Sequence, residues 1–243
     1  MVMPPLGLWY LASQLEAQGH ACDFFALDVD PLPADGDYDQ LWVSATSPQN
    51  YAVGQISEQV KDWTRTRTVF GGAAPWANPE RCQQFDFDLI VSGESDHPDT
   101  VRQIVEMAQT CERHSTLAPA ITPGPLAWVL PPVRRWDEKY HFYLTDREDN
   151  KHRATTTFTS RGCPMACAFC ESGTNGIIWS SVVRYEPVKI VAAQLREIVE
   201  RGHGAVQFYD DILPLNKLRT LAIMGSLKEY DLIWRCFLRT DVI

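Results

Sequence analysis

Three closely spaced cysteines constrain this chain more than any other feature. Cys163, Cys167 and Cys170 follow one another with the spacing C-x-x-x-C-x-x-C. Thiolates are soft ligands that select zinc, copper(I) or iron–sulfur clusters. A [4Fe–4S] cube usually takes four cysteines, so three thiolates would leave one iron open to a small molecule. The spacing therefore predicts a reactive cluster rather than a purely structural one.

A zinc site and ordinary buried cysteines are the alternatives. Structural zinc usually needs C-x-x-C pairs and a fourth ligand nearby. His152 or His203 could be that ligand, but the sequence holds no second pair. We expect the other four cysteines to be small buried hydrophobes: Cys22, Cys82, Cys111 and Cys236.

The cysteine loop resembles the cluster motif of the radical SAM superfamily. Phe169, just before the last cysteine, fits that motif, as does the β-type run at residues 155–160 that leads into the loop. The resemblance implies that the open iron chelates the amino and carboxylate groups of S-adenosylmethionine (SAM), with Phe169 among the SAM-binding residues. It also implies that an electron from the cluster cleaves SAM to methionine and a 5′-deoxyadenosyl radical.

Length and composition limit the class of protein. With 243 residues, the chain suits one large or two ordinary domains. It has no apolar run of about 18 residues and no signal-like N-terminus, so we expect no membrane association. Seven cysteines, three of them in a ligand motif, favour a reducing cytoplasm over a disulfide framework.

Charge is distributed unevenly along the chain. Residues 1–120 hold 6 Lys and Arg against 17 Asp and Glu, whereas residues 121–243 hold 16 against 14. Nucleic-acid binding needs a basic face, so the acidic half argues against a nucleic-acid partner.

The N-terminal part, residues 1–111, alternates helical and strand patterns. This alternation predicts parallel βαβ units in a doubly wound, Rossmann-like α/β domain. A first strand is apparently missing, because the helical pattern starts almost at Met1. The expected helices cover residues 6–19, 50–63 and 98–109, and the expected strands cover residues 21–27, 41–45, 68–72 and 89–93.

Small and polar residues follow the strands of this domain. Ligands of such sheets bind beyond the carboxyl ends of the strands, and glycine permits close backbone approach. Ordinary turn chemistry is the alternative explanation. The residues that we single out at this edge are Thr46, Gly71, Gly72, Gly93 and Glu94.

The same half is similar to the cobalamin-binding domain that is fused to some radical SAM enzymes. The likeness lies in the stretches at residues 4–12, 19–20, 71–80 and 91–94. It implies cobalamin at the edge formed by Thr46, Gly71, Gly72, Gly93 and Glu94. The chain lacks an Asp-x-His-x-x-Gly motif, so we expect no protein histidine on the cobalt.

Residues 112–153 are rich in proline and predict a linker, and residues 154–243 start a second βα series. Its expected strands are 154–160, 205–209 and 233–238, and its expected helices are 187–201 and 215–230. In barrel enzymes, functional groups lie on the loops after the strands. The cysteine loop and the pair Asp210 and Asp211 both follow such strands, which predicts the first part of a TIM-type radical SAM barrel.

Three carboxylates and one arginine complete the candidates. Asp210 and Asp211 suit the ammonium group or ribose of SAM, although an aspartate here could also cap a helix. Arg239 and Asp241 could contact SAM or substrate, or pair with each other.

We therefore expect a radical SAM enzyme with a [4Fe–4S] cluster, SAM and cobalamin, and methyl transfer or another radical reaction at an unactivated carbon. One alternative is a radical SAM enzyme whose first domain binds no cobalamin, and another is a non-catalytic Fe–S or cobalamin-binding protein. The expected partners are a small-molecule or peptide substrate and an electron donor such as flavodoxin or ferredoxin. With three barrel strands, we expect residues 1–243 alone to turn over no substrate.

Overall fold

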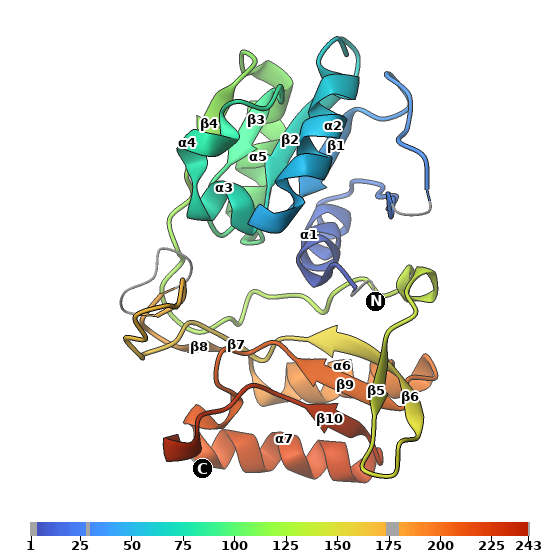
Figure 1. Cartoon of the computed structure of the whole chain (residues 1–243), viewed down its shortest axis with the longest axis vertical. Helices are drawn as coiled ribbons and strands as arrows, with labels where there is room; N and C mark the ends of the chain where they lie inside the picture. Colours follow the sequence, from blue (N-terminus) through green and yellow to red (C-terminus); the bar gives the residue numbers. More distant parts are fainter. Residues whose placement is uncertain (1–3, 28–29, 174–179, 243) are drawn as a thin grey trace. The chain divides into compact units, whose positions relative to one another are not determined.

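The computed structural model describes residues 4–27, 30–173 and 180–242. The chain divides into two compact units (Figure 1). The first unit is Tyr10–Thr122, and the second combines Met1–Trp9 with Pro123–Ile243. Helix α1 (Leu6–Ala17) begins in the second unit and ends in the first.

A four-stranded parallel sheet forms the centre of the first unit, with the strands in sequential order. Its strands are β1 (Gln40–Ser44), β2 (Arg67–Gly71), β3 (Leu89–Val91) and β4 (Ser115–Leu117). The connecting helices are η1 (Ser47–Gln49), α2 (Asn50–Val60), α3 (Ala73–Ala77), α4 (Pro79–Cys82) and α5 (Pro98–Thr110). The expected parallel α/β architecture is confirmed.

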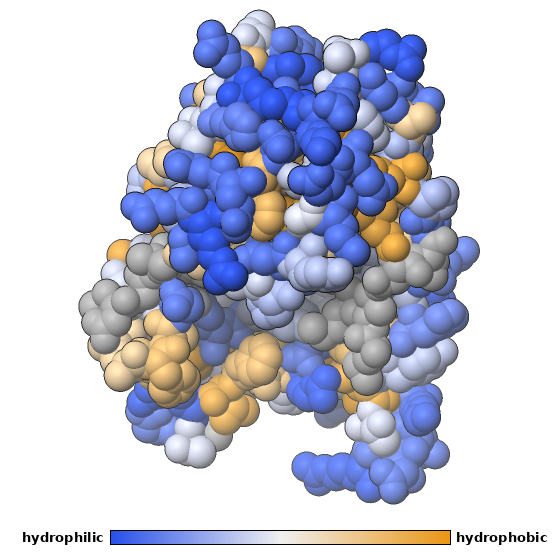
Figure 2. Space-filling model, turned by 45° about the horizontal axis from the view of Figure 1, so that its top comes forward, coloured by the Kyte–Doolittle hydropathy of each residue, from blue (hydrophilic) through white to orange (hydrophobic). Residues whose placement is uncertain are grey.

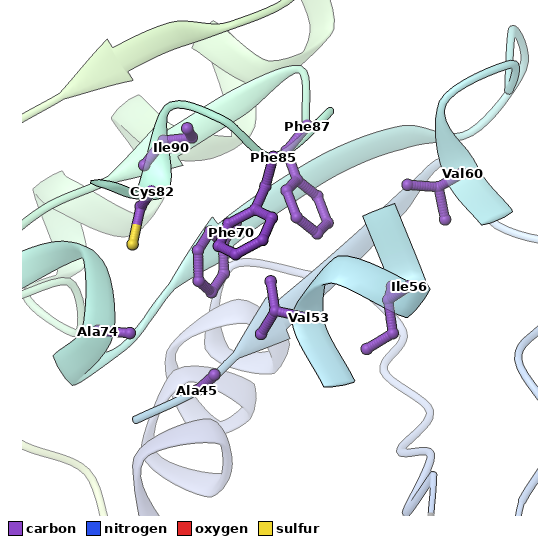
Figure 3. Close-up of a cluster of buried hydrophobic side chains, with 10 residues drawn as sticks. All are labelled: Ala45, Val53, Ile56, Val60, Phe70, Ala74, Cys82, Phe85, Phe87 and Ile90. Atoms are coloured by element: carbon purple, nitrogen blue, oxygen red, sulfur yellow. The ribbon is translucent and has the colours of Figure 1, made fainter. Parts of the chain in front are cut away.

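Helices cover both faces of this sheet. On one face, Phe70 packs at ring-centroid distances of 5.9 Å from Phe85 and 5.1 Å from Phe87, beside side chains of α2, α3 and α4 (Figure 3). On the other face, Ile104 and Ala108 of α5 pack on β2 and β3. Alternate strand residues point to opposite faces, so each strand supplies both cores.

The strand expected at residues 21–27 is wrong, because residues 21–26 are irregular. In a 2-1-3-4-5 doubly wound order, the second strand pairs only with the first, and among the described residues no strand precedes α1. Local contacts take its place: Ala26 donates its N–H to Asp30 (2.8 Å), and Phe25 packs edge-on against Tyr38.

The second unit holds a sheet in the order β10-β9-β6-β5, in which β6, β9 and β10 are parallel and β5 is antiparallel to β6. Its strands are β5 (Tyr143–Thr145), β6 (Lys151–Thr157), β9 (Ala205–Phe208) and β10 (Ile233–Arg235). A two-stranded ladder joins β7 (Ser160–Arg161) to β8 (Arg184–Tyr185). The helices are η2 (Asp137–Lys139), α6 (Val188–Glu200), η3 (Leu213–Leu215), α7 (Lys217–Glu229) and η4 (Thr240–Val242).

Helices α6 and α7 cover one face of this sheet, where Leu195 and Ile223 meet Val206 and Phe208. The apolar residues of α6 recur at helical spacing, which builds the continuous stripe that burial requires. On the opposite face, Ala154 and Ala205 form a small apolar cluster with Phe142 and Leu144, which lie beside and within β5. The two parallel βα crossovers agree with the expected partial barrel.

Three strands lie where the sequence predicts none. β4 belongs to the first sheet although it falls in the expected linker at residues 112–153, and β5 and β8 are short. No helix within the described ranges is long and apolar enough to cross a bilayer. The face shown in Figure 2 is mostly hydrophilic, with smaller hydrophobic areas.

Candidate functional site

The cysteine loop lies beyond the carboxyl end of β6 and begins directly after β7. Cys163 is buried and donates its N–H to the carbonyl of Ser180 (3.1 Å). Cys167 and Cys170 are half-buried, and the N–H of Cys170 reaches the carbonyl of Cys167 (3.1 Å). The loop therefore presents three free thiols at the strand end that the sequence predicts.

Gly162 starts the loop in a conformation that only glycine adopts readily, with φ at 94°. A Cβ atom there would lie 2.5 Å from the carbonyl oxygen of Val182 and 2.6 Å from that of Ser180. The chain after the loop thus packs directly on its first residue, which fixes where Cys163 emerges.

The pKa of Cys163 is raised by its surroundings. Burial raises the pKa of Cys163, and the charges of Asp211, Cys170 and Cys167 raise it further. Among the described residues, however, no three His, Cys, Asp or Glu side chains converge as ligands of one metal ion do. A [4Fe–4S] cube places each thiolate on a different iron, so its ligands do not need to converge on one point.

Asp210 is fully buried, and its carboxylate faces the strand end below the loop. One oxygen accepts the Thr159 hydroxyl (2.7 Å) and the Ser160 hydroxyl, and the other accepts the Thr159 N–H (3.0 Å). Burial raises the pKa of Asp210, and these hydrogen bonds oppose that shift. Both oxygens are thus engaged within the protein, so Asp210 fits an anchor of the loop better than the SAM-binding role expected from the sequence.

Arg219 of α7 completes this anchor, and sequence reasoning missed it. Its guanidinium donates to the Thr159 hydroxyl (2.9 Å), to the Thr159 carbonyl (2.6 Å) and to the Glu186 carbonyl (3.2 Å). Beside it, Gln194 links the Glu186 carboxylate (2.8 Å) to the Thr157 hydroxyl (2.6 Å). A buried polar layer therefore ties β6, α6 and α7 together beneath the cysteines. An arginine inside a helical pattern carries no sequence signal for this role.

Asp211 lies beside the cysteines, in contrast to its neighbour. It is half-buried, burial raises its pKa, and a hydrogen bond from the Ser172 side chain opposes the shift. Phe169 is 91% exposed, so the structure leaves its ring accessible next to Cys170. These two residues are the expected SAM-binding side chains that remain available to a ligand.

Two rows of side chains cross the sheet face opposite α6 and α7. Thr156, Gln207 and Arg235 pair in register on adjacent strands, and the Arg235 guanidinium donates to the side-chain amide oxygen of Gln207. Thr156 is buried, and its hydroxyl has no hydrogen-bond partner among the described residues. Residues two apart on a strand share a face.

The second row lies just beyond the strand ends, two residues after the first row, and is aromatic. The Tyr209 ring lies 6.2 Å from the Phe158 ring and 6.1 Å from the Phe237 ring. The residues of both rows are spread over the sequence, and only the strand register brings them together.

The residues expected at the cobalamin edge do follow the carboxyl ends of parallel strands. Three of them also have a role within the fold. Thr46 closes a capping box with Gln49 at the start of η1. A Cβ on Gly72 would lie 2.7 Å from the Ala45 carbonyl oxygen, and one on Gly93 would lie 2.6 Å from that of Pro119.

Protein backbone therefore fills the space that these two glycines were expected to leave for a ligand. A Cβ on Gly71 would make only ordinary contacts, the nearest at 3.8 Å, and Glu94 is buried. The sheet topology agrees with a ligand site at this edge, but Gly72 and Gly93 leave no open space for a ligand.

No protein-family model matches the chain. It is 27% identical to the uncharacterized methyltransferase PH0819 of Pyrococcus horikoshii over 98% of this chain and 56% of that protein. It is 24% identical to bacteriochlorophyllide d C-8(2)-methyltransferase of Chlorobaculum tepidum over 88% of this chain and 47% of that protein. The chain thus spans about half the length of the curated relatives that it matches.

The fold matches that of TsrM. TsrM from Kitasatospora setae is a radical S-adenosylmethionine methyltransferase that was solved with cobalamin and a [4Fe–4S] cluster bound, and the match has a TM-score of 0.60 at 12% identity. A second TsrM structure, with tryptophan substrate and a SAM analogue bound, matches with a TM-score of 0.63 at 13% identity. Both matches cover 94% of this chain and 48% of TsrM. At these identities the likeness shows the shared α/β fold alone.

Proposed function

We propose that the chain forms the cobalamin-type domain and the cluster-bearing barrel portion of a radical SAM methyltransferase. One observation carries this proposal: three free thiols lie on one glycine-started loop, at the carboxyl end of a parallel strand. Two methyltransferases as relatives and the shared fold of TsrM support the reaction class.

Cys163, Cys167 and Cys170 would hold a [4Fe–4S] cluster. The donor set fits in kind, because three free thiols on one loop at a strand end are the soft ligands that iron–sulfur clusters take. When bound, the cluster would supply one electron for reductive cleavage of SAM. An electron donor such as flavodoxin or ferredoxin is the proposed partner.

The protein's own residues would bind SAM and keep water away. The half-buried carboxylate of Asp211 would accept hydrogen bonds from the ammonium or ribose hydroxyl groups of SAM. Phe169 would offer an exposed ring beside it. Asp210 and Arg219 would act through Thr159, which they fix from below, so that the thiols stay in place.

The aromatic row would limit solvent access to the reacting carbon. Phe158, Tyr209 and Phe237 form a continuous aromatic surface, and exclusion of water protects reactive intermediates from quenching. A small-molecule or peptide substrate that contacts this surface could hydrogen-bond to the Arg235 guanidinium, which Gln207 orients.

Cobalamin would lie at the edge that contains Thr46, Gly71, Gly72, Gly93 and Glu94, with no protein histidine on the cobalt. The sheet topology and the fold of TsrM support this assignment. The backbone that fills the space beside Gly72 and Gly93 favours a second candidate, a radical SAM enzyme whose first unit binds no cobalamin.

Anaerobic reconstitution tests the proposal directly. The chain should bind about four irons with matching sulfide, and Cys163→Ala, Cys167→Ala or Cys170→Ala should each lower that content sharply. Cys22→Ala serves as the control, because Cys22 lies outside the loop and should change nothing. Stoichiometric zinc without sulfide would overturn the proposal.

A cobalamin titration separates the two candidates. Binding that shifts the visible spectrum, with no nitrogen hyperfine splitting from histidine in the EPR spectrum of the Co(II) form, supports the first. Absence of binding by a sample that is loaded with iron and sulfide supports the second.

A further inference from the structure

Arg239 contacts one of the predicted cluster ligands from a distant part of the chain. Its Nη1 donates to the Sγ of Cys167 at 3.5 Å, although the two residues are 72 positions apart. Arg239 lies in the segment after β10, and Cys167 lies in the loop after β7. The contact therefore depends on the tertiary fold of the second unit, and no local sequence pattern points to it.

Asp241 determines which edge of the guanidinium faces the sulfur. Its two carboxylate oxygens accept Nε (2.9 Å) and Nη2 (2.8 Å) of Arg239. Such two-pronged pairing fixes the orientation of the planar guanidinium. With that edge taken by Asp241, Nη1 is left for Cys167.

The charge of Arg239 is secure in this setting. An arginine side chain stays protonated in proteins, and Asp241 pairs with it directly. The arginine side chain is 40% exposed, so it lies at the rim of the loop and not in the core. Its replacement should leave the buried anchor formed by Asp210 and Arg219 intact.

We propose that Arg239 is a positioning residue that raises the reduction potential of a cluster held by Cys163, Cys167 and Cys170. This inference rests on the proposed function. Cluster potentials depend on net charge and on hydrogen bonds to the sulfurs. A cation that donates to a ligand sulfur stabilises the form with one more negative charge, which is the reduced cluster.

The redox step itself is simple. An external low-potential one-electron donor would supply one electron to a cluster held by the three cysteines, which would go from the 2+ to the 1+ state. No bond forms or breaks in this step, and no proton moves. Arg239 would make this electron easier to accept.

The test is a redox titration of the reconstituted 243-residue chain with dithionite and mediators, followed by the EPR signal of the reduced cluster. In Arg239→Gln, the equilibrium constant for reduction of the cluster should fall at least tenfold. This corresponds to a decrease of at least about 59 mV in the reduction potential for one electron. Arg239→Lys keeps the positive charge but loses the planar, two-pronged guanidinium. The reduction potential of its cluster should lie between those of the unchanged chain and Arg239→Gln. The EPR signal reports only loaded molecules, so partial cluster loss does not hide the result.

Arg201→Gln is the matched control. It removes the same charge from an arginine that pairs with Glu197 on α6, and its potential should equal that of the unchanged chain. Equal potentials in Arg239→Gln and the unchanged chain, or equal falls in Arg239→Gln and Arg201→Gln, would overturn the inference. If the unchanged chain forms no iron–sulfide cluster at all, the proposed function is the part that fails.

Discussion

The Asp210 carboxylate accepts hydrogen bonds from both the backbone N–H and the hydroxyl of Thr159, at 3.0 and 2.7 Å. Asp210 follows β9, and Thr159 lies between β6 and β7. Two neighbouring strand ends are thus joined by a buried carboxylate directly below the cysteine loop. The geometry of that loop therefore depends on a residue that touches none of its cysteines.

Asp210→Ala should destabilise the second unit by about 3–5 kcal/mol, because it removes one of the two buried carboxylates, Asp210 and Glu186, whose charges act on the buried Arg219. Urea unfolding followed by circular dichroism measures the change. Asp149→Ala, at an exposed hairpin position, is the comparison and should cost far less. Similar losses in both variants would show that the Asp210 network contributes little.

Gly162→Ala should lower both stability and iron loading. The left-handed backbone costs an alanine about 1–2 kcal/mol, and the new Cβ would clash with the carbonyl oxygen of Val182. Gly225→Ala makes a control of opposite sign. A Cβ on Gly225 meets no atom within 4 Å, and alanine in the interior of α7 should add about 0.5–1 kcal/mol. Iron content and the thermal midpoint of both variants test the pair.

Asp35 should make the first unit sensitive to acid. Burial alone would raise the pKa of Asp35, but hydrogen bonds from the N–H groups of Thr66, Thr64 and Arg65 outweigh it and hold the pKa below its usual value. A depressed folded pKa contributes stability above the unfolded pKa of about 3.9. That stability is lost as the pH falls through the folded value.

The measurement is urea unfolding of Asp35→Asn and the unchanged chain at several pH values. The variant should be less stable at pH 6, and the gap should close as the pH falls below about 4. Asp62→Asn, at an exposed position, should show no such dependence. A gap that stays constant from pH 6 to pH 2 would refute the assignment.

Phe70→Ala should cost about 3–5 kcal/mol, because the side chain is fully buried between two other aromatic rings. Tyr51→Ala on α2 removes a ring of similar size that is 80% exposed, and it should change stability by about 0.5 kcal/mol or less. Equal urea midpoints for the two variants would contradict the packing shown in Figure 3.

The sequence predicts the elements of this fold well where periodicity is strong. Helix α6 was expected at residues 187–201 and spans Val188–Glu200, since its apolar residues repeat at helical spacing. The strand expected at residues 21–27 fails because strand formation needs a partner, which a single sequence does not display. Short β4 is missed for the complementary reason: its three residues carry too little pattern, and its register with β3 decides it.

The candidate site likewise has one part that the sequence predicts and another that it does not. Cysteine spacing is local, so Cys163, Cys167 and Cys170 can be chosen from the sequence alone. The difference between Asp210 and Asp211 is not local, because it depends on which carboxylate faces Thr159. Arg219 and the row from Thr156 to Arg235 depend on strand register and helix packing, which appear only in three dimensions.

The antiparallel strand β5 limits where a further parallel strand can join the second sheet. It pairs with β6 at one edge of the sheet. A strand added at that edge would lie beside a three-residue strand that runs opposite to the parallel series. The other edge, β10, offers a parallel template with Trp234 44% exposed. Any further strand that extends the parallel series, from this polypeptide or another, must therefore join beside β10. Its carboxyl end would then reach the side of the sheet where the cysteine loop lies.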